Sequence, residues 1–207
     1  MLPSIETRWF MPGLPPPEAL AWIHRWELGP GKSEKRQDHY LSLPGTKDIG
    51  IKVRDGKFEV KRRDLLDLGL VSFGVRALGR PALWRKWSFK VPDDEGNKAP
   101  DSYWITIEKE RHLRKYRLDD ADLKANAVDP GSFPARGCTV ELTQLEVRGV
   151  KWWSVGFEAF DPDESQLRNT LNTVVQHCFH SEDYPTLNGE DSFDYPEWLA
   201  SFAAKQE

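Results

Sequence analysis

Residues 49–62 carry the pattern that most limits how this chain can fold. On either side of Asp55-Gly56, apolar residues alternate with charged or small ones. A period of two places the apolar side chains on one face of a sheet and the charged ones on the other. Asp-Gly between two such runs predicts a tight hairpin, because a type I′ turn needs positive φ at both central residues. The sequence therefore predicts an antiparallel hairpin with one apolar and one charged face.

Six further segments show a similar alternation and are predicted to be strands. They cover residues 4–10, 34–43, 84–91, 103–110, 137–147 and 151–160. Arg148-Gly149, between the last two segments, predicts a second hairpin. Because most of these strands are connected as neighbours along the chain, the expected sheet is antiparallel.

Helices are predicted at residues 17–23, 120–127 and 163–180, and a last short helix is predicted in the C-terminal tail. The longest of them has apolar residues at three- and four-residue steps, as on a helix with one buried face. Residues 64–83 are apolar without a clear period, and a connecting segment and a small helix are both compatible with them. The chain is therefore predicted to be one α+β domain over residues 1–207, with residues 163–207 packed against the strands.

Charge and hydropathy exclude several classes of protein. The 207 residues carry a net charge of −4, so no overall attraction to nucleic acid or to anionic lipid is expected. No apolar run approaches the roughly 20 residues of a membrane span, and the first residues lack the features of a secretory signal. Cys138 and Cys178 have no metal-ligand spacing. We expect a cytoplasmic protein with two free thiols, and the sequence gives no oligomeric state.

Charged residues in the middle of so many strands allow two arrangements. In the first, an open sheet packs on the helices and its charged face lies in water. In the second, the sheet closes into a barrel of about eight strands, with an apolar face under the helices and a charged face lining a tunnel. The paired tryptophans are then expected between the wall and the helices: Trp84, Trp87, Trp152 and Trp153. Interior charges of both signs are tolerated only if they pair or bind an ion. A closed barrel therefore predicts a site for a polyanion.

The order of several short segments carries a family resemblance across most of the chain. These segments are Ile5–Arg8, Arg36–Leu41, Gly50–Lys61, Ile107–Arg111, Val140–Leu142 and Gly156–Phe160. Taken together they resemble the CYTH superfamily, also called the triphosphate tunnel metalloenzymes. The resemblance implies a closed antiparallel barrel of eight strands that binds, and often hydrolyses, triphosphates with Mg²⁺ or Mn²⁺.

Two departures from the family's pattern concern its acidic residues. The family has Glu-x-Glu-x-Lys on the first strand, whereas the aligned residues here are Ser4, Glu6 and Arg8. The late Glu-x-Glu pair is reduced to Glu158, with Phe160 beyond it. Fewer carboxylates weaken the field that would fix a second cation. The pattern predicts a tunnel that still binds an anion but hydrolyses it slowly or not at all.

The resemblance also implies roles for individual side chains. The predicted phosphate-binding residues are Arg8, Arg36, Lys52, Arg54, Lys61, Lys86, Lys109 and Arg111. Such cations neutralise the nonbridging phosphate oxygens. Glu6, Glu141 and Glu158 are predicted to hold Mg²⁺ or Mn²⁺, with Glu6 and Glu158 also taking part in catalysis. For each of these residues the alternative is an ordinary cross-strand ion pair.

Three functions are therefore left open. The first is a metal-dependent triphosphatase that acts on a small-molecule triphosphate or polyphosphate. The second is a module that binds a polyanion or a nucleotide without turning it over. The third is an open-sheet domain whose charged face contacts a protein partner.

Overall fold

A computed structural model of the protein describes residues 3–43, 45–64, 67–90, 103–119, 124–181 and 183–203. The strands are β1 (Pro3–Pro12), β2 (Gly31–Leu41), β3 (Ile49–Arg54), β4 (Lys57–Arg63), β5 (Val71–Gly74), β6 (Ala77–Gly79), β7 (Ala82–Lys90), β8 (Trp104–Leu118), β9 (Ala125–Val128), β10 (Gly137–Val147) and β11 (Val150–Phe160). The α-helices are α1 (Pro17–Ile23), α2 (Leu167–Cys178) and α3 (Tyr195–Ala203). Short 3-10 turns lie at η1 (Trp26–Leu28), η2 (Glu164–Gln166) and η3 (Gly189–Asp191).

Eight of the strands close into a barrel. Neighbouring strands follow the order β10-β11-β1-β7-β4-β3-β2-β8, and β8 pairs in turn with β10. All of these pairings are antiparallel. β9 pairs with the last residues of β8, Lys115–Leu118, and β5 and β6 form a separate two-stranded sheet. The predicted closed α+β barrel is confirmed, and the open-sheet arrangement is wrong.

Both predicted hairpins are present, and their turns have the expected backbone. Asp55 and Gly56 have φ values of 48° and 65° between β3 and β4. Arg148 and Gly149 have φ values of 50° and 76° between β10 and β11. Positive φ at both central residues matches the right-handed twist of the flanking strands, which is why these short sequences set the register.

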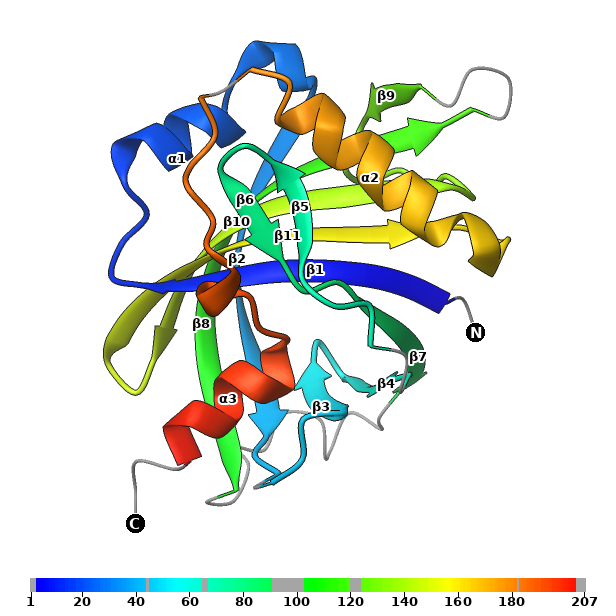
Figure 1. Ribbon diagram of the computed structural model, residues 1–207. Helices are drawn as coiled ribbons and strands as arrows, with labels where there is room; N and C mark the ends of the chain where they lie inside the picture. Colours follow the sequence, from blue (N-terminus) through cyan, green and yellow to red (C-terminus); the bar gives the residue numbers. More distant parts are fainter. Residues whose placement is uncertain are drawn as a thin grey trace.

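The outer face of the barrel is apolar where α2 covers it. Figure 1 shows α2 lying across β10, β11 and β1. Leu167, Leu171, Val174 and Val175 of this helix are buried together with outward-facing residues of these strands, such as Phe157. Burying an apolar side chain of this size contributes about 1.5–3 kcal/mol. This cluster forms the main core and leaves the inner face of the barrel for polar residues.

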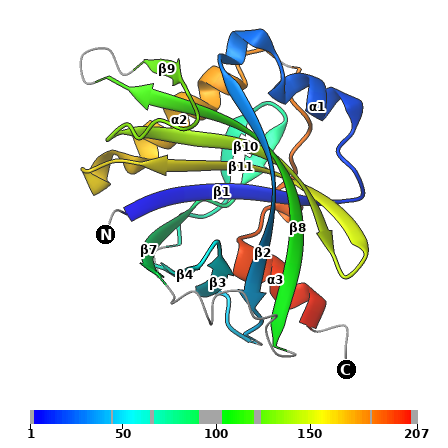
Figure 2. The same cartoon turned by 180° about the vertical axis from the view of Figure 1, so that it is seen from behind.

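Because the strands alternate in direction, the barrel has two distinct ends. The mouth is the end with the first residues of β1, β2, β4 and β10, and the floor is the opposite end. Helix α3 packs at the floor, where Trp198 stacks on Phe10 of β1 at a ring-centroid distance of 4.4 Å. Figure 2, which shows the molecule from behind, also has α3 at the floor of the barrel. A second apolar cluster, which includes Leu145 and Val147, surrounds this contact.

Three sequence-based expectations about secondary structure need correction. Residues 71–79 form the β5–β6 hairpin instead of a connection or a small helix. Residues 125–127 lie in β9, because they pair with Tyr116–Leu118 of β8, although a helix was expected over 120–127; residues 120–123 lie outside the described residues. The helix expected at 163–180 begins with the turn η2, and its regular part spans only Leu167–Cys178. Among the described residues, no helix has the length and apolarity needed to cross a membrane.

Candidate anion-binding tunnel

Charged side chains fill the interior of the barrel. They come from the alternate strand positions that face away from the apolar core, and they surround a cavity of about 100 Å³. Nine of the predicted site residues line this cavity: Glu6, Arg8, Arg36, Lys52, Lys61, Lys109, Arg111, Glu141 and Glu158. Trp84 also lines it, so its expected place between wall and helices is wrong; it shares the inward phase of Lys86 on β7.

Lys61 joins two carboxylates that face each other across a strand pair. Its Nζ lies 2.9 Å from Glu6 Oε2 and 2.9 Å from Glu158 Oε1, and Glu6 and Glu158 are directly opposite in the β1–β11 register. Burial acts to lower the pKa of Lys61, but the two carboxylates outweigh it and the pKa is raised well above its ordinary value. Lys61 in turn lowers the pKa of Glu158 to about 2. Lys61 and Glu158 are therefore both charged at neutral pH.

Arg8 lies deeper in the barrel and binds two carboxylates. Its Nη1 is 2.5 Å from Glu141 Oε1, and its Nη2 is 3.3 Å from Glu6 Oε1. Arg111 binds the second oxygen of Glu141. Burial acts to raise the pKa of Glu141, but the two arginines outweigh it and hold that pKa well below its usual range. Gly156 makes room for this arrangement, because a Cβ there would lie 2.5 Å from Arg8 Cζ. The sequence predicted the charged residues but not the need for this glycine.

Asp38 is the centre of a second group of ion pairs. It is 0% exposed, and its carboxylate lies 2.9 Å from Lys109 Nζ, 3.2 Å from Arg36 Nε and 3.8 Å from Lys52 Nζ. Burial would raise the pKa of Asp38, but the three cations hold it well below its usual range. Burial also lowers the pKa of Lys52 and of Lys109 to about 8, against the pull of Asp38. Asp38 was not among the predicted site residues, although its strand phase with Arg36 indicates the same inward direction.

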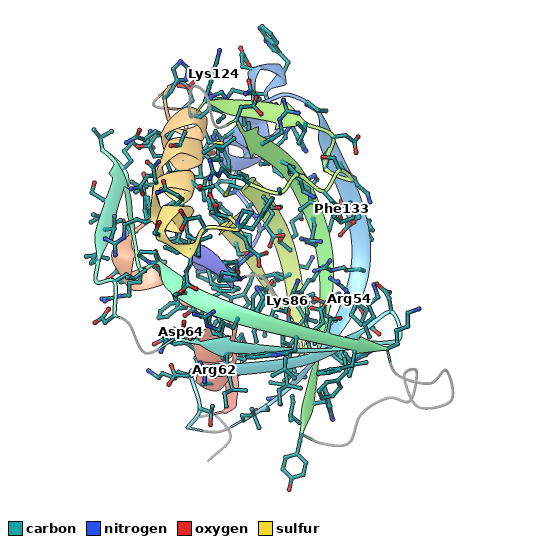
Figure 3. The ribbon with its side chains drawn as sticks, turned by 90° about the vertical axis from the view of Figure 1, so that its right-hand side faces the viewer. Arg54, Arg62, Asp64, Lys86, Lys124 and Phe133 are labelled. Atoms are coloured by element: carbon teal, nitrogen blue, oxygen red, sulfur yellow. The ribbon has the colours of Figure 1, made fainter. Side chains whose placement is uncertain are left out.

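The two remaining predicted residues lie toward the mouth. Arg54 Nη2 is 3.2 Å from Glu59 Oε1, and Lys52 Nζ is 3.0 Å from Glu59 Oε2. Lys86 is exposed and pairs in register with Lys61. Figure 3 looks toward this end of the barrel and labels Arg54 and Lys86 there. The structure thus brings nine predicted residues together at the cavity and places these two at its entrance.

Helix α3 supplies the floor of the cavity. Tyr195 stacks on Tyr40 of β2 with ring centroids 5.2 Å apart, and Lys109 Nζ lies 4.2 Å from the Tyr195 centroid. Lys109 also donates a hydrogen bond to Tyr40 Oη at 2.8 Å. Asp194 lines the cavity beside this pair, where burial raises its pKa to about 7 even though Arg63 binds it at 3.1 Å. Sequence reasoning missed Tyr195 and Asp194, because nothing in the C-terminal tail indicates contact with β2 or β4.

The acidic residues do not form a ready-made cation site. Glu6 and Glu158 share the ammonium group of Lys61, and both oxygens of Glu141 face guanidinium groups. Throughout the part of the chain that the structure describes, no three His, Cys, Asp or Glu side chains are placed to hold a metal ion. Mg²⁺ needs carboxylate oxygens that are free to coordinate it. The predicted ligands therefore lie close together but do not fit a divalent cation in this arrangement.

Comparisons with known proteins concern the fold. No protein-family model and no curated protein sequence matches the chain. Among solved structures, a conserved hypothetical protein from Pyrococcus furiosus has a TM-score of 0.47 at 16% identity, covering 94% of this chain and 98% of its own. The PH1012 protein from Pyrococcus horikoshii OT3 has a TM-score of 0.43 at 15% identity, covering 90% of this chain and 93% of its own.

A third solved structure is the S. pombe Pct1 RNA triphosphatase in complex with the Spt5 CTD. It has a TM-score of 0.35 at 12% identity, covering 88% of this chain and 76% of its own. Structural similarity at these low identities and TM-scores gives no information about what this protein binds. The chemistry of the tunnel rests on its own residues.

Proposed function

We propose that the barrel binds the phosphate groups of a small-molecule triphosphate or polyphosphate inside its tunnel. One observation carries this proposal: six basic side chains converge on a single cavity. They are Arg8, Arg36, Lys52, Lys61, Lys109 and Arg111. Cations of this kind neutralise nonbridging phosphate oxygens, and arginine does so with two parallel hydrogen bonds.

The carboxylates in the tunnel neutralise the basic side chains that we expect to bind the phosphates. Burying charges costs several kcal/mol per ion unless each has a partner, and the present ion pairs meet that need. A phosphate chain that enters replaces one set of anionic partners by another. For example, Lys61 exchanges Glu158 for a phosphate oxygen, and Glu158, whose side chain is 35% exposed, turns toward water at the mouth. In this exchange Lys61 stays paired, and the carboxylate that it releases is the one with the greatest access to water, since the side chains of Glu6 and Glu141 are only 11% and 8% exposed.

The metal-dependent reaction stays a separate prediction. The cation ligands implied by the family resemblance are Glu6, Glu141 and Glu158, and Glu6 and Glu158 are the residues predicted to act in hydrolysis. Lys61 binds an oxygen of Glu6 and an oxygen of Glu158, and Arg8 and Arg111 bind the two oxygens of Glu141, so we expect the proposed binding not to require Mg²⁺ or Mn²⁺. Phosphate release from tripolyphosphate, measured with either ion present, tests the hydrolysis.

Calorimetric titration with tripolyphosphate tests the binding. We expect binding with and without a chelator, and a loss of at least tenfold in affinity for Lys61→Met, since a buried charge-assisted contact contributes about 1.5–3 kcal/mol. Arg62→Met is the matched control, because Arg62 is an exposed cation on the same strand whose phase directs it to the outer face of the barrel. Absence of tripolyphosphate binding in the native protein, or an equal effect of the two variants, contradicts the proposal.

A further inference from the structure

The tunnel differs at its two ends, and this limits how a ligand lies in it. At the floor, Tyr195 and Pro196 of α3 line the cavity, and Pro196 approaches Gly50 so closely that a Cβ there would lie 3.2 Å from its ring. At the mouth, Lys57, Lys86 and Lys90 are exposed. A phosphate chain therefore enters through the mouth with its free end first. Whatever is attached to the other end of the chain remains at the mouth.

An exposed aromatic ring lies on the segment that borders the mouth. Phe133 belongs to residues 129–136, which lead from β9 into the first residue of β10. Its side chain is 94% exposed, so it contributes nothing to the core. Figure 3 shows Phe133 at the same end of the barrel as Lys86 and Arg54. Packing a flat apolar group against this ring would remove apolar surface of both from water, which is favourable.

Lys115 holds this segment in place. Its Nζ donates a hydrogen bond to the carbonyl oxygen of Ser132 at 2.7 Å and lies 5.2 Å from the centroid of the Phe133 ring. A cation near an aromatic face is attracted to it by about 0.5–1 kcal/mol at an exposed site. The aromatic ring is thus tethered to the barrel wall instead of lying on an unattached loop.

The register places Lys115, and with it the neighbouring Phe133, at the mouth of the tunnel. Glu158, which lines the cavity, pairs with Thr139 of β10, and Thr139 pairs with Lys115 of β8. Two strand spacings separate Glu158 from Lys115, which is about 10 Å at 4.7–4.9 Å per strand. The side chain of Lys115 then reaches Phe133. The ring therefore lies where the outer end of a bound phosphate chain would emerge.

We propose that Phe133 is a stacking platform for a planar aromatic group at the outer end of the substrate's phosphate chain. The substrate class is then a nucleoside triphosphate, with its phosphates in the tunnel and its base against Phe133 beside Lys115. Every base has a π-face, so a single phenyl ring binds it without selecting among bases. This inference rests on the proposed phosphate binding in the tunnel and adds what the ligand carries outside it.

Calorimetry with adenosine triphosphate and with tripolyphosphate, without metal, tests the inference on the full chain. Stacking on an aromatic side chain is typically worth enough that its removal weakens binding about tenfold. We expect Phe133→Ala to weaken adenosine triphosphate about tenfold and to leave tripolyphosphate unchanged, while Phe133→Trp retains the nucleotide affinity. Phe89→Ala is the matched control, because Phe89 is also an exposed phenylalanine but its strand phase directs it to the outer face of β7.

The outcomes separate this inference from the proposed function. If tripolyphosphate binds but Phe133→Ala leaves nucleotide affinity unchanged, the stacking platform is wrong and the phosphate site stands. If Phe133→Ala weakens both ligands equally, Phe133 only supports the wall and the inference is also wrong. If neither ligand binds the native protein, both proposals fail.

Discussion

Replacing Lys61 by methionine removes the one charge that separates Glu6 from Glu158. Both carboxylates lie 2.9 Å from the lysine nitrogen and face each other directly across β1 and β11. Breaking a buried ion pair by removing one partner costs about 3–5 kcal/mol. The Lys61 side chain keeps 24% of its surface exposed, so we expect the lower end, about 3 kcal/mol at pH 8.

The loss is expected to depend on pH with a defined sign. In the native protein Lys61 lowers the pKa of Glu158 to about 2, so this pair adds stability above the ordinary glutamate pKa of about 4.3 that disappears as the pH falls toward 2. In the variant, the lowering by Lys61 is lost, while burial and the nearby Glu141 still act to raise the pKa of Glu158, so part of the stability lost at pH 8 returns as the pH falls. The difference between the two proteins should therefore shrink between pH 8 and pH 4.

Urea unfolding at pH 8 and at pH 4.5 measures this difference. Lys57→Met, on the exposed start of the same strand, should change the free energy of unfolding by no more than about 0.5 kcal/mol at either pH. A loss below about 1 kcal/mol for Lys61→Met at pH 8 would show that the ion pairs are screened surface contacts. A loss of equal size at both pH values would refute the account of facing carboxylates.

Three further predictions follow from contacts elsewhere in the barrel. Gly156→Ala should cost about 2 kcal/mol in urea unfolding and weaken tripolyphosphate in calorimetry, because its Cβ would displace the Arg8 guanidinium; unchanged values would contradict the close contact. Affinity for tripolyphosphate should fall between pH 7 and pH 9, because Lys52 and Lys109 lose protons with pKa values of about 8; a flat calorimetric profile would contradict their role. Stability should fall as the pH drops below about 6.5, because burial and the nearby His24 lower the pKa of His112, whose Nδ1 lies 3.0 Å from His24 Nε2. In His24→Gln, the free energy of unfolding measured in urea should change less with pH over this range. An unchanged pH dependence would exclude the histidine pair as its cause.

The features that could be predicted from sequence are those fixed by neighbouring residues. Asp55-Gly56 determines a turn by backbone preference alone, and the strands beside it have only one register that keeps their apolar residues on one face. The inward direction of Lys52 and Lys61 then follows from strand alternation. One charged strand face could equally be exposed to water in an open sheet. The closed tunnel could be predicted only because other strands show the same alternation.

The features that were missed depend on contacts between distant segments. Residues 125–127 include two alanines with a high helix propensity, but pairing with the end of β8 makes them a strand. The β5–β6 hairpin is only a few residues long on each side, too short for a period to be visible. Tyr195 enters the tunnel from the C-terminal tail and stacks on Tyr40, a contact that no local pattern in either segment indicates.

A crystal structure of the protein with bound tripolyphosphate tests the central claim most directly. The account predicts phosphate oxygens within about 2.7–3.2 Å of Lys61 Nζ and of the Arg8 guanidinium, with Glu158 released from Lys61 and the free end of the chain directed toward Tyr195. Phosphate bound only on the outer surface, with the Lys61 and Arg8 ion pairs to Glu6, Glu141 and Glu158 intact, would contradict it.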